Sequence, residues 1–69
     1  MESILSLIQG IGDSCLSASW QVTRVSHEKY VVYHNDTQKC SGSIYEIESF
    51  LRGKGIDPAH GWHRSGTHK

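Results

Sequence analysis

The sequence predicts a small α+β domain, in which a three-stranded antiparallel β-meander carries an N-terminal and a C-terminal helix on one face (α-β-β-β-α). Three observations predict it. Apolar residues recur at helical spacing near the N-terminus, a central stretch rich in Val, Tyr and Trp contains two turn signals, and a helix-capping pattern begins at Ser43. The connections between the strands are too short for the crossovers that parallel strands need. The expected domain spans residues 1–56.

The first expected element is a helix that begins near Ser3. Its apolar positions repeat at helical spacing, and they are Ile4, Leu5, Ile8 and Ile11, with Cys15 extending the series. Gly10 and Gly12 each cost about 1 kcal/mol in a helix relative to Ala. We therefore expect the helix to end or kink there, and an extension to Leu16 is the alternative.

The strands of the meander are expected between residues 19 and 41. Strong strand formers dominate this stretch, and asparagine, aspartate and serine mark the turns between the strands. The expected strands are the run containing Trp20, Val22 and Val25, then residues 30–33, then residues 37–41, with turns at residues 26–28 and 35–36.

A second helix is expected at residues 43–53. Ser43 and Glu46 fit a capping box, in which the Ser43 hydroxyl accepts from the Glu46 amide and the Glu46 carboxylate reaches back to the Ser43 amide. Ile44, Ile47 and Leu51 then recur at helical spacing, and Gly53, Gly55 and Pro58 are typical of a helix end.

The expected core joins one face of each helix to one face of the sheet. Its members are Ile4, Ile8, Ile11, Trp20, Val22, Val32, Ile44, Ile47 and Leu51.

Residues 57–69 contain Pro58, two glycines and three histidines, so we expect a flexible or loosely docked tail.

Composition argues against several classes of partner. Seven Lys and Arg balance seven Asp and Glu, so no charge excess indicates a polyanion, and no apolar run could span a bilayer. Glu2 and the early glycines around the apolar stretch 4–11 are unlike a secretory signal, so we expect a cytoplasmic protein with Cys15 and Cys40 reduced. A disulfide between them is the alternative.

We find no pattern that predicts catalysis, a cofactor or a small-molecule substrate. Either cysteine beside His27 or His34 would be a Cys/His pair, but nothing marks a nucleophile elbow or an oxyanion loop. His60 and His63 supply only one loose pair of the four ligands that structural zinc needs, so no metal is expected.

The alternation of residues 30–33 predicts binding to another protein. Tyr30 and Val32 point to one face of the sheet, and Val31 and Tyr33 to the other, so we expect two short helices to leave one pair exposed together with Trp62. The expected partner-binding residues are Tyr30, Tyr33 and Trp62, with Arg24 and Lys39 at the rim. The predicted function is that of a small accessory or regulatory protein, of the kind phage and mobile elements encode, that binds a partner protein or forms a homodimer.

The alternative function is nucleic-acid binding. Aromatic rings on an open sheet stack on unpaired bases while nearby cations hold phosphates. The residues expected to serve it are Arg24, Lys29, Lys39, Arg52, Lys54 and Arg64.

Overall fold

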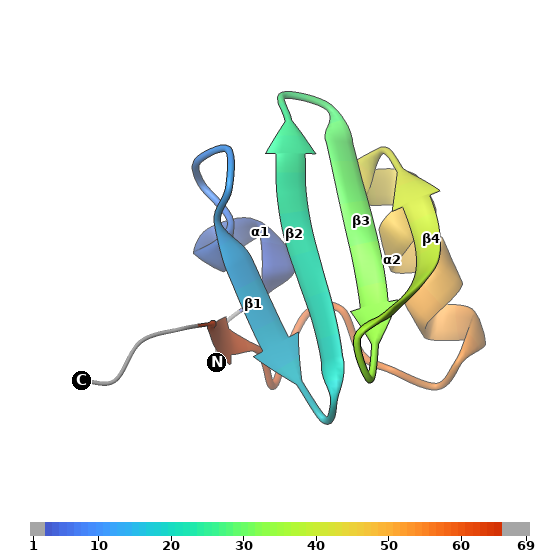
Figure 1. The fold of residues 1–69 in the computed structure, drawn as a ribbon. Helices are drawn as coiled ribbons and strands as arrows, with labels where there is room; N and C mark the ends of the chain where they lie inside the picture. Colours follow the sequence, from blue (N-terminus) through green and yellow to red (C-terminus); the bar gives the residue numbers. More distant parts are fainter. Residues whose placement is uncertain (1–2, 66–69) are drawn as a thin grey trace.

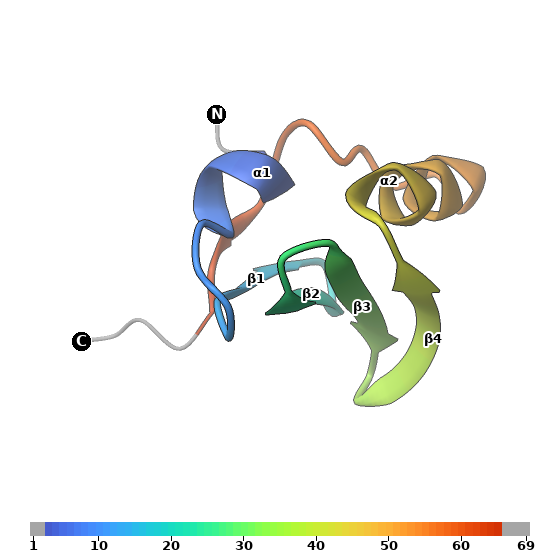
Figure 2. The same ribbon diagram turned by 90° about the horizontal axis from the view of Figure 1, so that it is seen from above.

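The protein has an α+β fold in which two helices cover one face of an antiparallel sheet (Figures 1 and 2). The computed structural model describes residues 3–65 of the 69. Its elements are α1 (Ile4–Leu7), β1 (Ser14–Ser17), β2 (Trp20–Ser26), β3 (Lys29–His34), β4 (Thr37–Gly42), α2 (Ile44–Gly53) and β5 (His63–Arg64). The strand order across the sheet is β4-β3-β2-β1-β5.

The sheet has five strands, so the prediction of a three-stranded meander was incomplete. β2, β3 and β4 are the predicted strands, and β1 and β5 extend the sheet on the β2 side. β1 pairs with β2 through a tight turn at Ala18 and Ser19, whose φ angles are 50° and 74°. Two-residue hairpin turns with positive φ at both positions favour Asn-Gly, and the Ala-Ser pair here gives no such signal.

α1 is a single turn, shorter than predicted. Ser3 caps it, because the Ser6 amide donates to the Ser3 hydroxyl and the Ser3 amide donates to the Ser6 hydroxyl. The chain then leaves the helix through a loop in which Gly10 N–H donates to Asp13 Oδ2 at 2.7 Å. This loop leaves Ile11 60% exposed, so its assignment to the core was wrong.

α2 confirms the second predicted helix. Ser43 is its N-cap, and its hydroxyl accepts from the Glu46 amide at 3.3 Å. Gly42 lies directly under Glu46, and a Cβ at Gly42 would collide with the Glu46 carboxylate. The helix ends at Gly53, and Lys54 is its C-cap. Gly55 follows with a φ of 83°.

The core lies between the helices and the face of the sheet that they cover. Most predicted members are buried there, and Ile44 is partly buried against them. The core also contains residues that were not predicted to belong to it, namely Leu7, Cys15, Tyr30 and Trp62.

The segment that follows α2 returns across the same face of the sheet. Pro58 is fully buried, and its carbonyl accepts from the Ile4 amide at 3.3 Å. Trp62 enters the core, and β5 then pairs with β1. Residues 57–65 of the expected tail therefore pack against the domain, whereas residues 66–69 lie outside the described part of the chain. Across residues 3–65, no helix has the length and apolar character needed to span a membrane.

Candidate functional site

One row of residues fixes which face of the sheet is which. Cys15, Val22, Val32 and Cys40 are register partners across β1 to β4, and all of them belong to the core or pack against it. Successive side chains of a strand point to opposite faces. The residues on either side of this row therefore point away from the helices.

Those residues form the open face, two rows on the side of the sheet opposite α1 and α2, and Figure 2 shows both helices on the other side. Leu16, Gln21, Tyr33 and Gln38 form one row, and Ser14, Thr23, Val31 and Ser41 form the other. None of these eight side chains is charged. Depletion of charge is what distinguishes the centre of a protein interface from the rest of a protein surface.

The side chains of the open face also contact one another. Ser14 Oγ and Thr23 Oγ1 are 2.9 Å apart in a hydrogen bond, and Gln21 Nε2 donates to Thr23 Oγ1 at 3.4 Å. Val31 is only 7% exposed and Tyr33 is half-buried, although no helix lies over them. The result is an uncharged surface with an apolar centre and hydrogen-bonding groups beside it.

Two of the predicted anchors do not lie at the surface. The pairs Tyr30/Val32 and Val31/Tyr33 do point to opposite faces, as predicted, but Tyr30 faces the helices and is 5% exposed. Trp62 is 2% exposed, because its ring completes the core and its Nε1 donates to the Asp57 carbonyl. The expected exposure of Tyr30 and Trp62 was wrong, and Tyr33 is the predicted aromatic residue that lies on the open face.

Arg24 makes its hydrogen bonds within the chain, on the same side of the sheet as its register partner Tyr30. Its guanidinium donates to the main-chain carbonyls of Gln9, Ser26 and His27 at 3.0, 3.3 and 3.0 Å, and it lies 5.8 Å from the centre of the Tyr30 ring. These contacts tie the loop before β1 to the β2–β3 hairpin. Lys39 is exposed, at a bulge in the edge strand β4.

The residues expected to bind nucleic acid are not gathered on the open face. Lys29 continues that face toward the β2–β3 turn, and Lys39 lies at its edge. Arg52 and Lys54 belong to the end of α2, on the opposite side of the sheet, and the Lys54 ammonium lies 5.5 Å from the centre of the Phe50 ring. Arg64 lies in β5, at the far edge.

Sequence reasoning missed a second surface, which we call the hairpin end. Its exposed apolar side chains are Ile11, Val25 and Tyr45. A recess of about 360 Å³ lies there, lined by His27, Glu28, Ser43, Ile44 and Tyr45. Helical spacing had placed Ile11 in the core, and the only sequence signal against this was the pair of flanking glycines.

The two cysteines lie too far apart for a disulfide. Two strands separate them, and strands are about 4.8 Å apart, so Cys15 and Cys40 are about 14 Å apart, whereas a bridge needs Cα atoms within about 7 Å. Burial raises the pKa of the Cys15 thiol to about 12, although a backbone hydrogen bond from Val22 opposes the shift.

Within residues 3–65, no three His, Cys, Asp or Glu residues are grouped as metal ligands would be.

Comparison of the chain with models of protein families, with curated proteins and with solved structures gives no match.

Proposed function

We propose that this protein binds another protein through the open face, with Tyr33 at the centre of the contact. The observation that carries the proposal is the two uncharged rows of residues on the side of the sheet opposite α1, α2 and the segment after α2. In this proposal the chain is a small accessory protein of the cytoplasm that regulates its partner by contact and catalyses no reaction itself.

The open face combines the two kinds of group that an interface needs. Tyr33 offers a large apolar ring with a polar tip, and tyrosine is among the residues that dominate binding energy at interfaces. Gln21, Gln38 and Ser41 surround it with amide and hydroxyl groups that donate and accept hydrogen bonds. A partner surface that is also uncharged at its centre would fit without burying an unpaired charge.

The distribution of basic residues favours a protein over a nucleic acid as the partner. Nucleic-acid affinity depends on many cations that contact phosphates along one surface. Arg24 is held by three carbonyl groups, and Arg52 and Lys54 lie across the sheet from the open face. Lys39 lies at the edge of the open face, and Lys29 lies four residues from Tyr33 along β3, at the β2–β3 turn.

A matched pair of substitutions tests the proposal. Ser41 lies on the open face and Ser49 on α2, both are exposed, and each is changed to Lys. Immobilised wild-type protein is incubated with native cytosol, with and without nuclease, and the captured protein is purified for titration. We expect Ser41→Lys to weaken binding, Ser49→Lys to leave it unchanged, and Tyr33→Ala to cost about 2 kcal/mol, roughly 30-fold in Kd.

Two outcomes would contradict the proposal. Equal affinities of the Ser41→Lys and Ser49→Lys variants would remove the open face from the interface. Loss of capture after nuclease treatment, with an affinity that falls steeply as salt rises, would favour the nucleic-acid alternative.

A further inference from the structure

β5 extends the open face by one short strand on the β1 side (Figure 1). His63 is the register partner of Leu16, and residues directly opposite each other in an antiparallel pair lie on the same face of the sheet. Leu16 belongs to the open face, so His63 does too. The preceding residue gives the same answer, because Trp62 enters the core and successive side chains of a strand point to opposite faces.

His63 therefore stands at the end of the row that contains Tyr33. The row crosses the sheet from His63 through Leu16, Gln21 and Tyr33 to Gln38. Three strand spacings of about 4.8 Å place His63 about 14 Å from Tyr33. A partner of ordinary size covers about 800 Å² of each protein, which is a circle of about 16 Å radius. An interface centred on Tyr33 would thus reach His63 at its border.

His63 differs from the two rows in its capacity to become charged. The eight side chains of those rows are uncharged, whereas an imidazole gains a proton and a positive charge between about pH 8 and pH 5. His63 is exposed to solvent.

The side chains of β1 that share this face with His63, Ser14 and Leu16, bring no charge to it. The next residue of β5, Arg64, is the register partner of Cys15 and so points to the opposite face. The charge at this border of the open face is therefore set by His63.

We propose that His63 makes binding through the open face depend on pH, so that affinity falls as the imidazole gains its proton. This inference rests on the proposed function, because it concerns the same surface. A partner that fits an uncharged face offers no counter-charge, so a proton on His63 adds an unpaired charge to the complex. The border of an interface stays in contact with solvent, and we therefore expect Kd to rise only about threefold.

The test is a titration of the purified partner protein at two pH values. The probe is the protein that immobilised wild type captures from native cytosol, and its Kd is measured at about pH 8 and about pH 5.5. Both values lie above the range in which Asp57 gains its proton, since the pKa of that carboxyl is lowered from 3.8. The quantity compared is the ratio of the two Kd values, because any pH dependence of the partner itself is common to all variants.

Two substitutions at His63 imitate its two protonation states. His63→Gln stays neutral, so its ratio should be about threefold smaller than that of wild type, with the wild-type Kd at pH 8. His63→Lys is charged at both pH values, so its ratio should fall equally, with a Kd already about threefold higher at pH 8. His27→Gln is the control, since it removes an exposed imidazole that lines the recess beside α2, and it should keep the wild-type ratio.

Two results would overturn the inference. They are equal ratios for wild type and His63→Gln, and a ratio that falls as much in His27→Gln as in His63→Gln. Either result leaves the proposed function in place when Ser41→Lys still weakens binding at pH 8 and Ser49→Lys does not. Equal affinities of those two serine variants contradict the proposed function and this inference together.

Discussion

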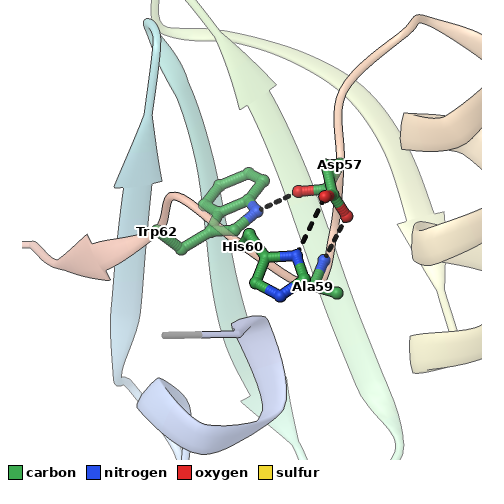
Figure 3. A network of polar contacts seen from close by, with 4 residues as sticks. All are labelled: Asp57, Ala59, His60 and Trp62. Atoms are coloured by element: carbon green, nitrogen blue, oxygen red, sulfur yellow. Dashed lines mark hydrogen bonds and ion pairs between the residues drawn. The ribbon is translucent and has the colours of Figure 1, made fainter. Parts of the chain in front are cut away.

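The Trp62 indole donates a hydrogen bond of 2.8 Å from Nε1 to the main-chain carbonyl of Asp57, five residues earlier in the chain (Figure 3). The Asp57 carboxylate accepts from the Ala59 amide at 2.8 Å and contacts His60 Nδ1 at 3.1 Å. These contacts close a turn that points the Trp62 ring into the core. The segment after α2 is therefore a third cover of the core, beside α1 and α2.

Removal of the Trp62 ring should destabilise the whole domain. Replacing a buried Trp by Ala costs about 3–5 kcal/mol, which is a large part of the stability of a domain of this size. We expect Trp62→Ala to unfold at far lower urea concentration than wild type, or without added urea, as followed by circular dichroism. Trp62→Phe keeps most of the ring packing and loses the hydrogen bond to Asp57, so it should cost less. A change below about 1 kcal/mol in Trp62→Ala would mean that the segment is dispensable.

The turn at Asp57 should make the stability of the folded state fall as the pH is lowered into the acidic range. The amide of Ala59, followed by His60, lowers the pKa of Asp57 below its ordinary value of 3.8. A carboxyl group with a lowered pKa in the folded state stabilises that state above its unfolded pKa, and the contribution disappears as the pH falls through the folded pKa. Asp57→Asn should therefore lose less stability than wild type when the pH is lowered through this range.

Urea unfolding at several pH values on both sides of 3.8 measures this dependence. Asp36→Asn, which removes a carboxylate from the exposed turn between β3 and β4, is the control for the loss of a negative charge elsewhere. Parallel curves for Asp57→Asn and wild type would show that the turn contributes nothing to acid sensitivity.

Local signals predicted the parts of the fold that depend on neighbouring residues. α2 was predicted because Ser43 caps it and its apolar residues repeat at helical spacing. The β3–β4 turn was predicted because Asn35 and Asp36 tolerate positive φ, and their φ angles are 53° and 68°. β1 was missed because Cys15 continued a helical repeat and Ala18 and Ser19 carry no turn signal.

The burial of side chains depends on contacts between distant segments, and the sequence predicted it only in part. Alternation along β3 was enough to place Tyr33 and Val31 on the face opposite Tyr30. It could not show which face the helices cover. Trp62 is buried because a whole segment folds back over the sheet, and its glycines and histidines instead indicated a loose tail.

Substitutions in the turn between β1 and β2 should raise the stability of the domain. Ala18 and Ser19 both have positive φ, a conformation that costs a residue with a Cβ about 1 kcal/mol relative to Gly. The double variant Ala18→Asn with Ser19→Gly should therefore raise the free energy of unfolding by about 1 kcal/mol. Thr37→Gly, at an exposed position in a strand, is the matched control and should lower it. A loss of stability in the double variant would show that the Ala18 and Ser19 side chains make contacts that outweigh the strain.

The two thiols should differ widely in reactivity, because the thiolate is the form that reacts. With a pKa of about 12, only about one Cys15 in ten thousand is ionised near pH 8, and its side chain is also fully buried. Cys40 is only half-buried, in an edge strand. We expect iodoacetamide to modify one site of the folded protein quickly, and peptide mapping to identify it as Cys40.

The variant Cys40→Ser isolates the slow site. Its folded form should resist iodoacetamide over the period in which wild type is fully modified once, and in urea it should react at the rate of an ordinary cysteine. Mild oxidation of wild type should form no bond between Cys15 and Cys40 of one chain, because two strands hold them about 14 Å apart. Modification of folded Cys15 at the rate of Cys40, or an internal disulfide, would require the sheet to open between β1 and β4.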